Sequence, residues 1–171
     1  MREWVPVPGS AKARLIEAAI YHFELTGYDA VNVVDLASKA SVTTGALYHH
    51  FGSKFGLYLT VREDMEKRIV ERMEGAAAAT GGQGHAAVRA ALLVAFDAAA
   101  RLNVCRILGE QPPVDRGDPV ATALRPLLTR HKAPAADMLA AAWRAALLSV
   151  TTGVTSAAAR SSLAYVLDAG R

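Results

Sequence analysis

The segment from Val33 to Lys54 constrains the fold more than any other part of the chain. It reads VVDLASKASVTTGALYHHFGSK, in which two stretches with helical spacing of apolar residues flank a turn at Ser41 and Val42. The small side chains of Ala37 and Ala40 allow a second helix to cross the first one closely. The pattern predicts a helix-turn-helix, a unit that can place its second helix in the major groove of DNA.

Capping residues mark the ends of the predicted helices. Asn32 precedes the first helix as an N-cap, and Thr43 or Thr44 can cap the second. Gly52 is a suitable residue to end the second helix, and Ser53 can cap a further helix that Lys54 opens.

The second helix has an inner and an outer side. Leu47 and Phe51 lie four positions apart, so we expect them to point inward together and to be buried. The outer side is then expected to contact DNA, with Tyr48 and Lys54 at phosphates and Thr44, Gly45 and His49 near base edges. Gly45 would permit close approach, since it has no side chain. The full set predicted at the DNA is Thr43, Thr44, Gly45, Tyr48, His49, His50 and Lys54.

This segment resembles the DNA-binding domain of the TetR family of bacterial transcriptional repressors. The matching residues are Leu36-Ala37, Ala40, Val42, Gly45, Leu47-Tyr48, His50-Phe51 and Lys54, preceded by Leu15, Ile16, Ala19, Ile20, Phe23 and Gly27-Tyr28. The resemblance covers about residues 10 to 60, and the rest of the chain is similar only in being helical and of suitable length. Val34 stands where some relatives carry a polar residue that contacts a base, which puts more weight on the second helix.

Composition favours helices throughout. The chain has 171 residues, 52% of them hydrophobic and only 6% aromatic, and alanine is abundant. Its net charge is +3, yet residues 1–60 contain five Lys and Arg against five Asp and Glu. DNA binding would therefore depend on local placement of side chains and not on a general basic field. The single cysteine, the lack of a signal peptide and the interrupted apolar stretches predict a cytoplasmic protein without a membrane span.

We expect an all-α protein of two domains. Residues 1–53 would form an N-terminal three-helix domain with the helix-turn-helix, and residues 54–171 a C-terminal helical domain for regulation, ligand binding and dimerisation. Helical patterns follow at about 54–74, 85–103, 104–108, 120–131, 134–152 and 156–167, with loops at 76–84 and 110–119.

The last two helices, about residues 134–169, are alanine-rich and apolar on more than one side. In the resembled family these two helices form a four-helix bundle with a second subunit. The resemblance therefore implies a homodimer, which a two-fold symmetric operator also requires. The alternative is that the two helices only close the core of the monomer.

The C-terminal helices could enclose an apolar pocket for a small neutral or anionic effector. The residues predicted to line it are Leu92, Phe96, Cys105, Leu108, His131, Trp143 and Leu147. The alternative is an ordinary packed core at the same positions.

Catalytic and metal-binding patterns are not evident. Gly81-Gly82-x-Gly84 lacks the preceding strand and the lysine of a phosphate-binding loop, and the adjacent His49 and His50 point to different sides of a helix. We therefore expect a DNA-binding regulator and not an enzyme, with no cofactor and no metal. The resemblance implies a repressor that binds a palindromic operator as a homodimer and is released by a small molecule. The alternatives are a helical protein-interaction module and a nonspecific DNA-binding protein.

Overall fold

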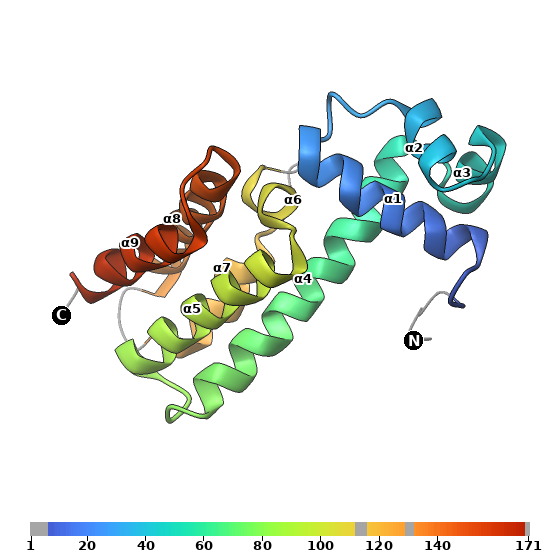
Figure 1. Cartoon of the computed structure of the whole chain (residues 1–171). Coiled ribbons are helices and arrows are strands. Elements are labelled where there is room, and N and C mark those ends of the chain that lie inside the picture. The colour runs from blue at the N-terminus through green and yellow to red at the C-terminus, as the bar shows by residue number, and fades with distance from the viewer. Residues whose placement is uncertain (1–6, 112–115, 129–131, 170–171) are drawn as a thin grey trace. The chain divides into compact units, whose positions relative to one another are not determined.

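The chain is all-helical over the residues that the structure describes. The computed structural model describes residues 7–111, 116–128 and 132–169, and no strand occurs among them (Figure 1). The elements are α1 (Ala11–Thr26), α2 (Val33–Lys39), α3 (Thr44–Phe51), α4 (Lys54–Ala78), α5 (Gly84–Leu102), α6 (Cys105–Gly109), α7 (Pro119–Leu124), the 3-10 helix η1 (Arg125–Leu127), α8 (Lys132–Thr151) and α9 (Ser156–Asp168). The predicted all-α fold is confirmed. No helix in the described ranges is long and apolar enough to cross a membrane.

The chain packs as two compact units, residues 1–64 and 65–171. The division lies inside α4, which contributes one buried face to both units through Leu57, Val61, Met65 and Ile69. The boundary predicted at residues 53 and 54 assigned functions to the two parts of the chain, and that functional division stays a prediction.

The first unit is built on the fully buried side chains of its short helices. Leu15 and Phe23 of α1, Leu36 of α2 and Leu47 of α3 are at most 1% exposed. Ala37 and Ala40 are also buried, and their small size lets α3 pack closely on α2. The expected burial of Leu47 is therefore confirmed.

Phe51 differs from the expectation, because it is only half-buried. It is the last residue of α3, directly before Gly52, so its ring lies at the edge of the unit. There the ring lies 5.8 Å from the Lys12 ammonium and edge-on to the His50 ring.

The second unit places α8 against α5, α6, α7 and α9. Helix α5 is buried along most of its length, and Trp143 and Leu147 of α8 are at most 1% exposed. Helix α6 lies close to α8 at Gly109, where an added Cβ would lie 2.9 Å from Cγ of Leu148. A side chain at position 109 would therefore push α6 away from α8. Helices α8 and α9 run side by side at one edge of this unit (Figure 1).

The helix predicted at about 120–131, with a bend expected before Pro126, ends as an α-helix at Leu124, and residues 129–131 lie outside the described residues. The α-helix α7 gives way at Arg125 to the 3-10 turn η1, which contains Pro126. Proline has no amide proton for the helical ladder, which accounts for the change at this point.

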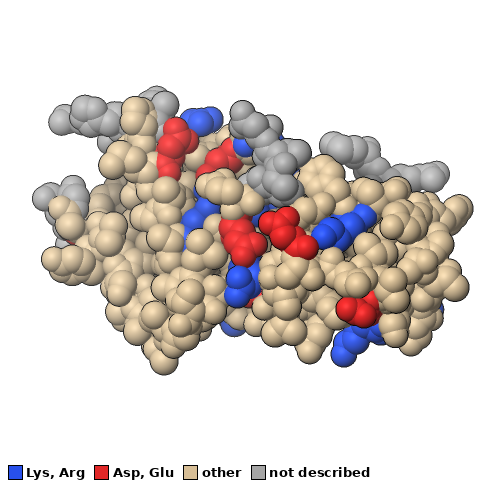
Figure 2. Space-filling view, turned by 90° about the horizontal axis from the view of Figure 1, so that it is seen from above, with Lys and Arg blue, Asp and Glu red and all other residues tan. Residues whose placement is uncertain are grey.

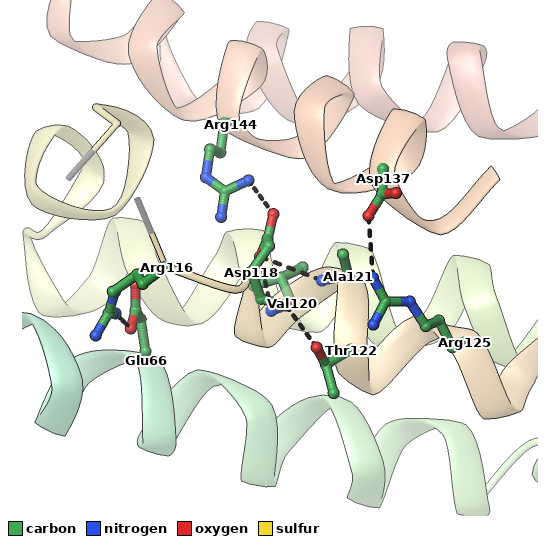
Figure 3. A network of polar contacts seen from close by, with 9 residues as sticks. All are labelled: Glu66, Arg116, Asp118, Val120, Ala121, Thr122, Arg125, Asp137 and Arg144. Carbon is green, nitrogen blue, oxygen red and sulfur yellow. Dashed lines mark hydrogen bonds and ion pairs between the residues drawn. The ribbon is translucent and has the colours of Figure 1, made fainter. Parts of the chain in front are cut away.

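A chain of ion pairs connects elements of the second unit (Figure 3). Asp118 caps α7 by accepting from the amides of Val120 and Ala121 at 2.9 and 3.2 Å, and its carboxylate also pairs with Arg144 of α8. Arg116, two residues earlier, pairs with Glu66 of α4. Two residues of one short segment thus tie α4 and α8 to the start of α7.

The pKa of Asp118 reflects two opposing effects. Burial raises it, but the hydrogen bond and positive charge of Arg144 and the two capping amides lower it more, so the pKa lies below the ordinary value of 3.8. A lowered carboxyl pKa stabilises the fold above 3.8, and this stabilisation is lost as the pH falls through the folded-state pKa.

Replacing Asp118 by Asn tests this pair. The amide side chain can still cap α7, but it leaves the buried guanidinium of Arg144 without its countercharge, which we expect to cost about 1–3 kcal/mol of unfolding free energy. Urea unfolding measures the difference, with the exposed Asp137→Asn as the control. The decrease in unfolding free energy should be constant near neutral pH and become smaller below pH 3.8. A difference between Asp118→Asn and the native protein that does not change with pH would contradict the role of the charge.

Replacing Leu47 by Ala tests the core of the first unit. We expect this change to cost about 2–5 kcal/mol, because Leu47 is fully buried, and Phe51→Ala to cost less than the roughly 3–5 kcal/mol of a buried phenylalanine. Thermal unfolding followed by circular dichroism measures both. If Phe51→Ala lowered the unfolding free energy more than Leu47→Ala, this would contradict the finding that Leu47 is fully buried and Phe51 only half-buried.

Candidate nucleic-acid interface

Side-chain caps fix both ends of the helix-turn-helix. Asn32 accepts a hydrogen bond from the amide of Val34 at 2.8 Å and starts α2. Thr43, and not Thr44, caps α3 by accepting from the amide of Ala46 at 3.2 Å. Gly52 ends α3 with a φ of 74°, and Ser53 caps α4 by accepting from Gly56 at 2.9 Å. The predicted caps at Asn32, Gly52 and Ser53 are confirmed.

The turn between α2 and α3 is held by backbone and side-chain bonds. Ser41 has a left-handed φ of 52°, and the amide of Val42 donates to the carbonyl of Ala37 at 3.0 Å. Arg14 of α1 reaches the same turn, since its Nε donates to the carbonyl of Ala40 at 2.9 Å. Sequence reasoning missed this arginine, although its place between Ala13 and Leu15 on the inner face of α1 was a signal of an internal bond.

The outer side of α3 is accessible. Thr43, Gly45, Tyr48, His49 and His50 are exposed, and Thr44 is half-buried. The Tyr48 side chain is 52% exposed, so it is not part of the core. Six of the seven residues predicted to contact DNA therefore share one accessible stretch, from residue 43 to residue 50. Their contacts with DNA stay a prediction.

The side chain of Lys54 points in a different direction from the one expected. Its ammonium points to the loop between α1 and α2, where it donates to the carbonyls of Tyr28 and Val31 at 3.0 and 3.1 Å. The phosphate contact predicted for Lys54 stays a prediction, but in this conformation the ammonium is engaged elsewhere.

The described cations on one face of the molecule do not form one continuous field. On the face shown in Figure 2, basic and acidic side chains are intermixed within a mostly uncharged surface. In the first unit, Lys12 and Lys39 lie over the rings of Phe51 and Tyr21, at 5.8 and 4.6 Å. Binding to a polyanion would therefore use positioned donors, as the balance of charges in residues 1–60 predicted.

Six of the seven residues predicted to line an effector pocket are buried in the second unit: Leu92, Phe96, Cys105, Leu108, Trp143 and Leu147. The seventh, His131, lies outside the described residues. The Nε1 donor of Trp143 has no hydrogen-bond partner among the described residues. A ligand site at these positions stays a prediction.

Three hollows in the second unit lie mainly at other residues. One of about 480 Å³ lies between α4 and α7–η1 and is lined by Val70, Met73, Thr122, Pro126 and Leu127 among others. A second, of about 520 Å³, includes Phe96 of the predicted set with Arg101 and Arg160, and a third, of about 380 Å³, includes His85 and Met138. No group of three or more potential metal ligands occurs in the described part of the chain.

Comparisons with known proteins agree with this architecture. Residues 15–61 match the family model described as bacterial regulatory proteins, tetR family. The HTH-type transcriptional regulator BetI of Paraburkholderia phytofirmans is 26% identical over 87 residues, which are 51% of this chain and 45% of that protein. The match thus spans about half the length of this curated relative.

Solved structures match over nearly the whole chain. A TetR-family transcriptional regulator from Pectobacterium atrosepticum has a TM-score of 0.67 at 22% identity, over 92% of this chain and 90% of that one. A transcriptional regulator (TerR/AcrR family) from Aquifex aeolicus has a TM-score of 0.69 at 18% identity, over 95% and 100%. At these identities the likeness shows a shared fold. Residues 15–61 thus resemble the tetR family of bacterial regulatory proteins, and the described chain shares the fold of these solved structures.

Proposed function

We propose that this regulator binds a palindromic DNA operator as a homodimer, with α3 of each subunit in the major groove. The observation that carries the proposal is the accessible side of α3, which its caps and the buried Leu47 hold in one orientation. A rigid helix with polar groups on its free side suits contact with base edges.

The residues of α3 divide by reach and chemistry. Tyr48 is a long side chain that is 52% exposed, so its hydroxyl is the proposed phosphate donor. Thr44 and His49 are proposed near base edges, with Gly45 between them allowing close approach. Thr43 uses its hydroxyl oxygen in the cap, so it and His50 are proposed at the rim of the contact. Val34 of α2 is 62% exposed and apolar, and it adds no hydrogen-bonding group.

We propose that the second copy covers an exposed apolar face of α8 and α9. Met138 of α8 is 72% exposed, and Tyr165 and Val166 of α9 are 76% and 52% exposed. Around them lie exposed small residues, among them Ala141 and Ala145. Large exposed apolar side chains next to small ones favour close helix packing with a partner.

We further propose that the protein is a repressor released by a small molecule. The hollow between α4 and α7–η1 supports this, because its lining is mostly apolar and it lies against α4, the helix shared by both units. A ligand that binds better when α4 is displaced would lower operator affinity by its differential affinity for that state.

Selection of bound sequences from random DNA tests the operator. We expect an inverted repeat whose half-sites are centred about one helical turn or more apart. The Thr44→Ala protein should lose base preference at one position in each half-site, by about 1–3 kcal/mol if the hydroxyl contacts a base. Tyr48→Phe should instead weaken binding to all DNA sequences alike. A protein-interaction module would select no DNA, and a nonspecific DNA-binding protein would enrich no consensus.

A charge on the α8–α9 face tests the dimer. Val166→Glu should bring an unpaired carboxylate into the interface and shift the protein to a monomer, measured by sedimentation equilibrium at micromolar concentration. The control is Ser38→Glu, which adds the same charge at an exposed position of α2, outside the α8–α9 face. If the Val166→Glu protein and the native protein both have the mass of a dimer, another surface forms the interface.

A further inference from the structure

Lys54 lies in a cage of three carbonyl groups. Its Nζ lies 3.0 Å from the oxygen of Tyr28, 3.1 Å from that of Val31 and 3.4 Å from that of Asp29. An ammonium has three protons and accepts no hydrogen bond, so each proton can face one of these oxygens. A phosphate contact by Lys54 would require the ammonium to leave these partners.

The three carbonyls belong to a loop without helical bonding. Residues 28–31 connect the end of α1 at Gly27 to Asn32, which caps α2. Within the described residues, no backbone amide donates to the carbonyls of Tyr28, Asp29 or Val31. Lys54 therefore supplies hydrogen-bond donors to three loop carbonyls that accept from no backbone amide in the described part of the chain.

Aromatic packing strengthens the same contact. The Lys54 ammonium lies 4.5 Å from the centre of the Tyr28 ring, within the range of a cation–π interaction. The Tyr28 ring also lies 6.1 Å from that of Phe55 and 4.9 Å from that of Tyr58. Three residues from the start of α4 thus hold one side of the loop.

Lys54 stands at a place in α4 where a positive charge is not favoured. Lys54 is the first residue of α4, next to its cap Ser53, where the helix dipole disfavours a positive charge. The three carbonyl oxygens offset this cost. The loop that they belong to leads into α2, and α2 leads through the turn at residues 40–43 into α3.

We propose that Lys54 is a positioning residue, which fixes the start of α2 against the first turn of α4 and so sets the orientation in which α3 meets DNA. The effect on DNA rests on the proposed function, whereas the effect on α2 does not. Lys54 then connects the DNA-contacting helices to the helix that continues into the second unit.

The test compares Lys54→Met, Lys54→Arg and the control Lys67→Met, which removes a 60% exposed lysine from the same helix. Amide chemical shifts of the free proteins are recorded below the thermal transition. Both Lys54 variants should shift the amides of residues 32–36 and 44–48, because neither a thioether nor a planar guanidinium can replace a tetrahedral ammonium in this cage. Lys67→Met should leave these amides unchanged.

Operator binding is then measured against salt, on the duplex that the native protein selects from random DNA. Both Lys54 variants should bind roughly tenfold more weakly, as expected from losing charge-assisted hydrogen bonds, with the native salt slope. A phosphate anchor behaves differently: Lys54→Met would lower the slope by about 0.9, and Lys54→Arg would restore binding.

Each outcome decides the proposal. Unchanged amides at residues 32–36 in Lys54→Met, a lowered slope, or full rescue by arginine overturns the positioning role. If the native protein selects no DNA, the proposed function fails, while the shifts of the free protein still decide whether Lys54 positions α2. If Lys54→Met does not fold, Lys54→Arg carries both measurements.

Discussion

The packing of α3 on α1 and α2, with Leu47 fully buried, is the contact on which the first unit depends. Helix α3 is short, from Thr44 to Phe51, and a helix of this length is not stable alone in water. Its orientation therefore comes from its buried side and its caps. Because α3 is fixed from the inside, its other side can carry polar and small residues.

Local patterns made much of this unit predictable from the sequence. Caps such as Asn32 and Ser53 act within a few residues, so their spacing shows where helices begin. Leu47 could be placed inside because helical periodicity determines the buried side of a short helix. Phe51 shares that period but lies at the helix end, where the neighbouring elements no longer cover it, so periodicity alone overstated its burial.

Contacts between residues far apart in the sequence were not predictable in the same way. Lys54 bonds to a loop more than twenty residues earlier, and Arg14 to a turn of similar separation. Long basic side chains can reach in many directions, and the sequence does not show which carbonyls lack donors. The ion pairs of Arg116 and Asp118 with α4 and α8 have the same character.

The second unit combines a well-packed interior with open apolar surfaces. Buried residues such as Trp143 and Phe96 could be predicted as apolar helix positions, but the sequence could not distinguish a filled core from a cavity. The hollow at Met73 and Leu127 depends on how α7 ends at Arg125 and Pro126 beside α4. The shape of such a space is determined by tertiary packing, and the periodicity of the sequence does not predict it.

The most direct test of the account is a map of amide chemical shifts as the selected operator duplex is added to the native protein. The account predicts the largest changes at residues 43–50 on α3, with smaller changes at the start of α2. Changes confined to residues 65–171, with α3 unaffected, would contradict the central claim that α3 is the helix that contacts DNA.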